Sequence, residues 1–312
     1  MKYRIYLPGL ASLLSVLFLL FVVSCSKEKS SGETNQEEEQ VSMVSTESEA
    51  EAEMVYNGVF DDVMGVNDDV GMAGTGIFGR SAIAVEPGSP EMARPLACFT
   101  VSVTHPANTL FPARVVIDFG ATPCMGPDGH TRRGKIVIEY TNRLIIPGAI
   151  AATSFQDFYF DSIKVEGTHK ITNTSSPLGT LPLSRQFKAE VINGKLTHPN
   201  GNFVEWNSTK TVTQIEGLIT PDRPLDDIFK IEGASRGRAK RGNLLVAWES
   251  NVVEPLIKKF TCRWIVKGIV RTLRVNATAN SPWVSSLNFG NGTCDNQAVV
   301  TINGVSRQIT LR

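Results

Sequence analysis

The sequence has little of what the common catalytic and metal-binding motifs require. Histidine is scarce, with only four positions, and two of them, His105 and His198, precede proline, where an extended loop conformation is the default. There is no G-x-S-x-G nucleophile elbow, no H-E-x-x-H zinc motif and no glycine-rich phosphate loop. We therefore assign no catalytic residue, metal or cofactor from the sequence, and whether the protein is an enzyme stays open.

Long apolar runs are also scarce, because only the stretch from about Leu10 to Val23 approaches the length needed to enter a membrane. It follows the cations Lys2 and Arg4, in the order typical of a secretory signal peptide, and it is followed by a small residue and then Cys25. A membrane-spanning helix needs about 20 consecutive apolar residues, more than this run contains. We predict a lipoprotein signal peptide over residues 1–24, with Cys25 as the acylated first residue of the mature chain.

Acylation of Cys25 with palmitate or similar chains predicts the localisation. Several acyl chains hold a protein at a bilayer far more firmly than one chain does. We expect a protein bound to the outer membrane, on its periplasmic face or on the cell surface, with the lipid bilayer as its first partner. All residues after Cys25 are then outside the inner membrane, where nucleic acid is not an expected partner.

Charge is distributed unevenly along the chain. Between Ser26 and Val70 the sequence has thirteen acidic residues and only two lysines. Because the whole chain has a formal net charge of zero and Lys2 and Arg4 lie ahead of this segment, the residues from Gly71 onward carry a net charge of +9. Residues 25–50 are also poor in large apolar side chains, so we predict a disordered acidic tether there.

Residues 51–93 are predicted to contain one short N-terminal amphipathic helix and a connection. Apolar residues recur at spacings of three and four between Glu51 and Met72, with Asp61 and Asp62 on the opposite side. Such a helix packs against a sheet, and docking on a partner is the alternative. Clusters of glycine and proline up to residue 93 indicate a flexible connection.

From residue 94 to residue 312 the pattern changes to that of strands. Polar and apolar residues alternate in stretches such as Lys135–Tyr140, Phe203–Trp206 and Thr211–Ile215, and turn signals such as Asn193-Gly194 separate the stretches. Alternation implies sheets with one solvated face, which favours antiparallel pairing. We predict a mainly β domain, built as an antiparallel sheet or a sandwich.

The β domain contains an internal duplication. An apolar residue, Asp or Asn, Phe and Gly, followed after three residues by Cys, occur at 117–124 and again at 287–294. With Cys25 acylated, four cysteines remain, and four cysteines allow three disulfide pairings. A four-thiolate zinc site is the alternative, but it normally uses closely spaced cysteine pairs, which are absent. Equivalent positions in the two units favour the pairs Cys98 with Cys124 and Cys262 with Cys294.

The segment Gly126–Gly134 is the most polar insertion in this domain. It is present in the first unit and missing from the second, and an insertion that a hairpin does not need is a candidate for function. We predict that it lines a site for an anionic or sugar ligand and that its polar residues can be replaced without loss of stability. The alternative is drift in an exposed loop. The candidate ligand residues are Asp128, His130, Arg132 and Arg133.

Two other groups of residues have competing interpretations. The four tryptophans could form a stacking platform for a glycan, or they could fill the core. They are Trp206, Trp248, Trp264 and Trp283. The basic stretch Arg236–Arg241 is interpreted as a loop, which could contact lipid phosphates or be a solvated hairpin tip.

These features together resemble a family of uncharacterised lipoproteins from Bacteroidetes. The resemblance covers most of residues 55–312 and rests on the lipidated cysteine, the acidic helix, Val116–Gly120, Arg133–Ile136 and Asn288–Asp295. It implies an envelope lipoprotein and identifies neither a ligand nor a catalytic residue. In that lineage, Asp followed by Ser or Thr and an apolar residue implies O-glycosylation, which makes Ser162 a candidate modification site.

For function, we expect a non-catalytic binding or structural module of the cell envelope, with a glycan or another envelope component as its partner. Strands, turns and disulfides account for nearly every marked residue. The alternative is a glycan-acting hydrolase, with Asp128 and either Asp118 or Glu139 as its carboxylate pair. Such a pair needs its carboxyl groups about 5 to 9.5 Å apart in a cleft.

Overall fold

The computed structural model describes residues 31–64, 98–106, 109–126, 129–177, 179, 185–219, 226–275, 281 and 283–311, with side chains from residue 35 onward. The contacts discussed below belong to one compact unit that begins at Glu38. The predicted signal peptide, Cys25, the predicted connection up to residue 93 and Asp128 lie outside the described residues.

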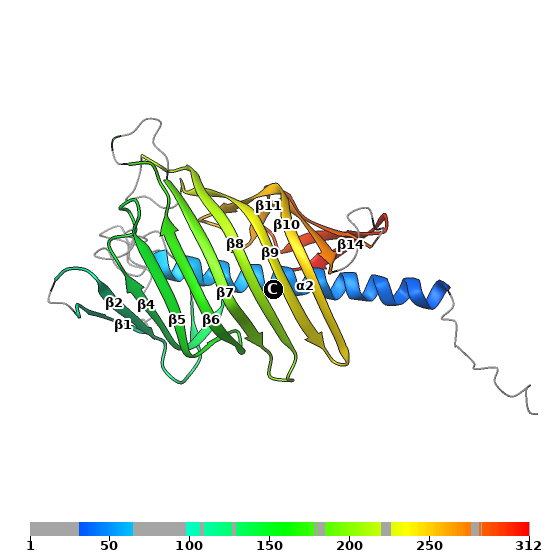
Figure 1. The fold of residues 1–312 in the computed structure, drawn as a ribbon, viewed down its shortest axis with the longest axis horizontal. Helices are drawn as coiled ribbons and strands as arrows, with labels where there is room; N and C mark the ends of the chain where they lie inside the picture. The colour runs from blue at the N-terminus through cyan, green and yellow to red at the C-terminus, as the bar shows by residue number, and fades with distance from the viewer. Residues whose placement is uncertain are drawn as a thin grey trace, which may run out of the picture. The chain divides into compact units, whose positions relative to one another are not determined.

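The protein is mainly β, as predicted, with one antiparallel sheet of 14 strands and, in the described part of the chain, one helix (Figure 1). The elements are α2 (Ser31–Met64), β1 (Thr100–Thr104), β2 (Ala113–Asp118), β3 (Cys124–Met125), β4 (Thr131–Tyr140), β5 (Ile150–Phe160), β6 (Ile163–Asn173), β7 (Arg185–Thr197), β8 (Phe203–Glu216), β9 (Ile228–Arg241), β10 (Leu244–Lys259), β11 (Ile265–Arg274), β12 (Ser285–Asn291), β13 (Gln297–Ile302) and β14 (Val305–Thr310). Consecutive strands pair with each other, except that β2 pairs directly with β4 and the short β3 pairs with β4 alone. The predicted sheet is therefore a single meander with β1 and β14 at its edges.

Alternation along each strand divides the sheet into an inner, buried face and an outer, solvated face. In β8, every second residue from Val204 to Gln214 is buried, among them Val204, Trp206 and Val212, whereas the residues that alternate with them are partly or fully exposed. Successive side chains of a strand point to opposite faces, so one apolar set covers the inside. The prediction of antiparallel strands with one wet face is confirmed.

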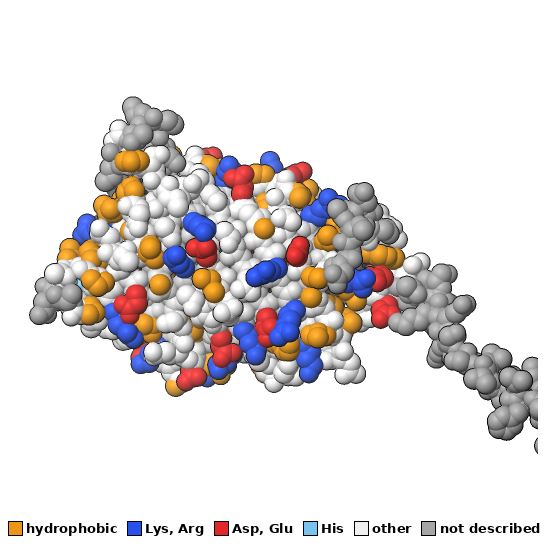
Figure 2. Space-filling view, in the orientation of Figure 1, with side chains coloured by type: hydrophobic (Ala, Val, Ile, Leu, Met, Phe, Trp, Pro, Cys, Tyr) orange, Lys and Arg blue, Asp and Glu red, His pale blue; other side chains and the backbone are white. Residues whose placement is uncertain are grey.

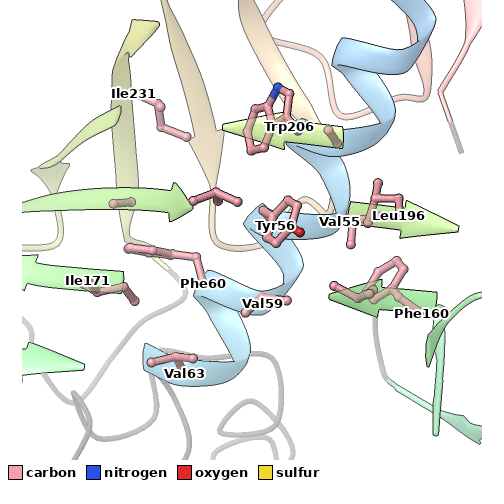
Figure 3. Packing of buried hydrophobic residues seen from close by; sticks show 14 of the residues in the cluster. Val55, Tyr56, Val59, Phe60, Val63, Phe160, Ile171, Leu196, Trp206 and Ile231 are labelled. Atoms are coloured by element: carbon pink, nitrogen blue, oxygen red, sulfur yellow. The ribbon is translucent and has the colours of Figure 1, made fainter. Parts of the chain in front are cut away.

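The helix α2 lies along the inner face, and in Figure 1 it passes behind β5 to β10. One side of it carries large apolar residues at spacings of three and four, which align on a single face of a helix. These are Val55, Tyr56, Val59, Phe60 and Val63, all buried. They meet strand residues such as Phe160, Leu196 and Ile231 (Figure 3). The apolar core thus lies between α2 and the inner face of the sheet.

The structure corrects the prediction for residues 31–50, because α2 begins at Ser31 and is not a short helix that begins near residue 51. Its early part is packed: Val41, Ser45 and Thr46 are buried. The Ser45 hydroxyl donates to the Val41 carbonyl (2.8 Å), and Thr46 Oγ1 lies 2.5 Å from Ser285 Oγ of β12. Small polar residues can be buried when their hydroxyls find partners, so low hydrophobicity did not mean disorder here.

The two duplicated segments adopt the same local structure. The Gly120 amide donates to Asp118 Oδ1 (2.9 Å), and the Gly290 amide donates to Asn288 Oδ1 (2.8 Å). Both glycines have positive φ, 73° and 94°, which residues with a Cβ rarely adopt. The phenylalanine between each pair is buried. The same Asp or Asn turn therefore lies at the end of β2 and within β12, which continues to Asn291.

The disulfides follow the duplication, as predicted. Cys98 pairs with Cys124 (Cα–Cα 5.6 Å) and Cys262 pairs with Cys294 (Cα–Cα 5.7 Å). In the first unit β1, β2 and β4 are neighbours, and in the second β11, β12 and β13 are neighbours, in the same antiparallel order. Because all four sulfurs are bonded in pairs, the four-thiolate zinc alternative is wrong.

Candidate functional site

The described residues of the predicted ligand loop do not form one exposed site. His130 is buried, its Nδ1 contacts Asp161, and its ring centre lies 4.7 Å from that of Phe160. Gly129 packs against the second unit, since a Cβ added there would lie 2.6 Å from Arg263 Nη1. The glycine and the histidine therefore serve packing, and the burial of His130 contradicts the expectation that the polar residues of this loop can be replaced without loss of stability.

Arg132 is also structural. It belongs to β4, where alternation directs its side chain to the inner face, and its Nε donates to Asp62 Oδ2 of α2 at 2.9 Å. Both side chains of this pair have no exposed surface. Asp62 was predicted to point away from the packed side of the helix, and the buried guanidinium explains why it does not. Arg133, the next residue, lies on the outer face with its guanidinium carbon 3.5 Å from the centre of the Tyr159 ring.

Seven carboxylates of α2 contact a strand or turn residue. Glu38 and Glu39 pair with Arg274 and Arg307 near the surface, and the other five, which are more buried, are Glu49, Glu51, Glu53, Asp61 and Asp62. Glu53 pairs with Lys210 of β8 (3.0 Å), and Asp61 pairs with Lys258 of β10. The acidic segment and the basic domain of the sequence thus neutralise each other inside the fold. A buried charge is tolerated when it is paired and hydrogen-bonded.

Two of the four tryptophans are core residues whose ring N–H groups are committed to Glu49. Trp206 Nε1 and Trp248 Nε1 each donate to Glu49 Oε2 at 2.8 Å, and the Ser235 hydroxyl contacts the other oxygen. Both tryptophans are buried. The prediction of a glycan platform made of all four tryptophans is therefore wrong. Trp283 also packs against the core, where it is partly buried.

Trp264 lines a cavity of about 370 Å³ between α2 and the strands, called here the helix-side pocket. Its polar wall comes from α2, the β7–β8 turn and the end of β9. Its apolar wall comes from the segment around Trp264 and from the last strands. The residues of the two walls used below are Glu47, Glu51, Asn57, His198, Asn200, Asn202 and Arg241 on one side, and Trp264, Ile265, Phe289, Ile309 and Leu311 on the other.

Glu51 is at the centre of the polar wall. Its Oε2 lies 2.7 Å from Arg241 Nη2 and 3.1 Å from His198 Nε2. Burial alone would raise the pKa of Glu51, but the hydrogen bonds with His198 and Arg241 outweigh burial and hold the pKa below its ordinary value. The pocket therefore contains an ionised carboxylate with a compensating guanidinium. Sequence reasoning missed this group, because its members lie far apart in the chain.

Side-chain amides of the β7–β8 turn complete the polar wall. Asn200 Oδ1 accepts from the Asn202 amide (3.1 Å), and Asn202 Oδ1 accepts from the Gly242 amide (2.9 Å). Both side-chain oxygens already accept a hydrogen bond from a backbone amide. The NH₂ groups are therefore the parts of Asn200 and Asn202 that a ligand can use. Asn57 of α2 donates from Nδ2 to Glu53 (3.3 Å), which leaves its oxygen as an acceptor.

Asp118 and Glu139, the two predicted partners of Asp128 in a hydrolase, are each paired with a cation. Asp118, which is partly exposed, pairs with Lys135 across the strands (2.7 Å), and the exposed Glu139 pairs with Arg114 (3.1 Å). The hydrogen bond from Lys135 and then the one from the Gly120 amide lower the pKa of Asp118. A general acid for glycoside cleavage needs a raised pKa instead. These two residues therefore do not support hydrolysis, and Asp128 lies outside the described residues.

The other predicted sites are placed as follows. Arg236–Arg241 is the end of strand β9 and not a loop, with Arg238 paired to Glu205 on the outer face and Arg241 turned into the helix-side pocket. Ser162 is exposed in the β5–β6 turn, where Asp161 and Ser162 have positive φ of 46° and 69°. Within the described ranges, no three His, Cys, Asp or Glu side chains form a group that could hold a metal ion.

Within the described residues, no helix is both long enough and apolar enough to cross a membrane, and this includes α2. Comparisons of the chain with protein-family models, with curated proteins and with solved structures found no match.

Proposed function

We propose that this is a lipid-anchored protein of the outer membrane whose β domain binds a small, neutral, hydroxyl-rich ligand, such as a saccharide, in the helix-side pocket. The observation that carries the proposal is the opposition of the two pocket walls. Amides and a carboxylate face an apolar surface that contains Trp264 and Phe289. Binding sites commonly combine an apolar lining with a few placed polar groups.

The polar wall offers both donors and acceptors. Asn200 and Asn202 present NH₂ groups, whereas Asn57 presents an oxygen and Glu47, exposed at the rim, presents a carboxylate. A sugar ring has hydroxyls that both donate and accept, and it has apolar C–H faces. The wall around Trp264 suits those faces, because aromatic rings provide a large apolar surface of fixed geometry.

Charge also favours a neutral ligand. Glu51 is balanced by Arg241, and Lys258, which also lines the pocket, is balanced by Asp61. A strongly charged ligand would compete with these internal pairs. A neutral ligand can bind through hydrogen bonds and leave them in place.

A glycan-array screen of the full chain tests the proposal, followed by titration of each hit. Replacement of Trp264 with Ala should weaken binding about tenfold, which corresponds to about 1.4 kcal/mol. Trp283→Ala is the matched control, because Trp283 is also partly buried but does not line the pocket. Equal losses in both variants, or no glycan hit, would contradict the proposal. Turnover measured on each hit separates binding from hydrolysis.

The anchor is tested separately. Replacing Cys25 with Ala should leave an uncleaved precursor that takes up no labelled palmitate, because the thiol is the acylation site in the pattern that residues 19–25 resemble. Normal processing and labelling of this variant would show that the protein is anchored in another way or not at all. Accessibility of the protein to protease on intact cells then distinguishes the cell surface from the periplasmic face.

A further inference from the structure

We propose that the outer face of the sheet carries a second binding site, for a phosphate or sulfate ester group. The site is a hollow of about 610 Å³ at the ends of β4 to β7, called here the outer hollow. Its principal residues are Arg133, Tyr159, Ser162, Lys164 and Thr197. It opens on the outer face, whereas the helix-side pocket lies on the inner face; His198, just after β7, lines both, and the proposal does not depend on the function proposed for the helix-side pocket.

The strand register places the key side chains in one row. Arg133 of β4 is opposite Tyr159 of β5, Tyr159 is opposite Lys164 of β6, and Lys164 is opposite Thr197 of β7. Neighbouring strands lie about 4.8 Å apart, and residues directly opposite each other share a face. Two cations, a phenol ring and a hydroxyl thus line the same strip of the outer face.

Arg133 is held in an orientation that suits an oxyanion. Its guanidinium carbon lies 3.5 Å from the centre of the Tyr159 ring, so the planar group is stacked on the phenol. Stacking uses the face of the guanidinium and leaves the N–H groups at its edge for hydrogen bonds. Two parallel N–H groups match two oxygens of a phosphate or sulfate.

Lys164 adds a second positive charge beside the guanidinium of Arg133. It is exposed, and hydrogen bonding with Glu166 (3.1 Å) raises the pKa of its ammonium group, which is therefore charged at neutral pH. An exposed ion pair of this kind contributes little, so the ammonium can turn toward a ligand at small cost. The hydroxyls of Ser162, at the turn, and Thr197 are further donors that line the hollow.

The carboxylate that lines the hollow is already engaged. Asp161 accepts from the Thr131 amide (2.7 Å) and the Thr131 hydroxyl (3.2 Å), and its other oxygen contacts His130 Nδ1. Burial would raise the pKa of Asp161, but these hydrogen bonds, that of His130 first, hold it below its ordinary value. Its oxygens are thus directed to β4, and Arg133 and Lys164 dominate the charge presented to a ligand.

Blue and red side chains lie side by side on the outer face (Figure 2). Lys188, for example, pairs with Glu190 at 2.7 Å, and Arg238 pairs with Glu205. Those two cations provide a control that removes the same charge from the same face. They do not line the outer hollow.

The full chain is produced without O-glycosylation of Ser162. It is titrated with inorganic phosphate and with inorganic sulfate at low ionic strength, and isothermal titration calorimetry measures the binding. The Arg133→Gln/Lys164→Gln variant should bind at least about tenfold more weakly, since charge-assisted hydrogen bonds are the stronger kind. The Lys188→Gln/Arg238→Gln variant should bind like the original. Ser162→Ala, a small change at an exposed turn, should weaken binding less and tests the site if the double variant fails to fold.

Two further arms identify the source of the ester group. Glucose 6-phosphate that binds more tightly than phosphate, while glucose does not bind, points to a soluble sugar ester. Retention on vesicles of phosphatidylcholine with phosphatidic acid, but not on phosphatidylcholine alone, points to a lipid headgroup. The proposal is overturned if no anion binds at millimolar concentration, or if the control variant loses as much affinity as the Arg133 and Lys164 variant.

Discussion

Arg132 and Arg133 are neighbours in β4, but they lie on opposite faces of the sheet and have opposite roles. Arg132 has no exposed side-chain surface and is paired with Asp62 of α2, whereas Arg133 stacks on Tyr159 in an open hollow. The same contrast holds for the whole sheet. Charges on the inner face are bound to the helix and maintain the fold, whereas charges on the outer face form exposed pairs, within a strand or across strands, and are accessible to ligands.

The largest expected effect is the loss of a charge from the inner face. Arg132→Met should lower the free energy of unfolding by about 3–5 kcal/mol, because Asp62 would remain buried without its guanidinium. Arg133→Met is the control and should cost less than about 1 kcal/mol. Denaturant titration measures both. Equal losses in the two variants would contradict the distinction between the two faces. Combining Arg132→Met with Asp62→Leu should recover much of the stability lost in Arg132→Met alone.

A smaller effect is expected from pH, through the buried His169. Burial lowers the pKa of His169 from 6.5 to about 4. The unfolded chain therefore takes up this proton first as the pH falls, so stability is lost between pH 6.5 and pH 4, by about 3 kcal/mol at most. The lowered pKa of Glu51 acts in the same direction, since its contribution is lost as the pH falls through its folded pKa.

Replacing His169 with Phe sharpens that test. Nδ1 of His169 has no hydrogen-bond partner among the described residues, and its ring lies beside Tyr56, so an apolar ring can take its place. Thermal unfolding followed from pH 7 to pH 4 should then show a weaker dependence on pH than in the original chain. An unchanged profile would assign the acid sensitivity to the helix carboxylates instead.

The smallest effect is expected on the outer face. Glu205→Gln removes the pair with Arg238, whose side chains are 33% and 56% exposed, and should change the free energy of unfolding by less than about 1 kcal/mol. Glu53→Gln is the matched change on the inner face, where Glu53 and Lys210 are 6% and 5% exposed. It should cost clearly more than Glu205→Gln. The reverse order would contradict the division of roles.

Much of the β domain could be predicted, because its signals are local. Alternation of polar and apolar residues predicted the strands, and the repeated Asp or Asn, Phe, Gly and Cys pattern predicted the disulfides. The early part of α2 could not be recognised in this way. Residues such as Ser42, Ser45 and Thr46 are buried because partners in the sheet and in the helix backbone accept their hydroxyls, and those partners do not appear in a window of sequence.

The helix-side pocket was out of reach for a related reason. Glu51 is 147 residues from His198 and 190 residues from Arg241, so no spacing indicates that they meet. The one available signal was the charge imbalance between the acidic segment and the basic domain. We interpreted the acidic part as a solvated tether, whereas the structure uses it to neutralise cations inside the fold.

The position of α2 at the start of the chain affects how the protein can be synthesised. Its partners are synthesised much later. Arg132 follows Asp62 by 70 residues, Lys258 follows Asp61 by 197 residues, and Trp283, whose carbonyl accepts from Ser42, follows it by 241 residues. Contacts between distant parts of a chain slow folding. The helix is therefore made first, and a chain interrupted before β10 would lack Lys258, the partner of Asp61, and the Trp283 carbonyl that accepts from Ser42.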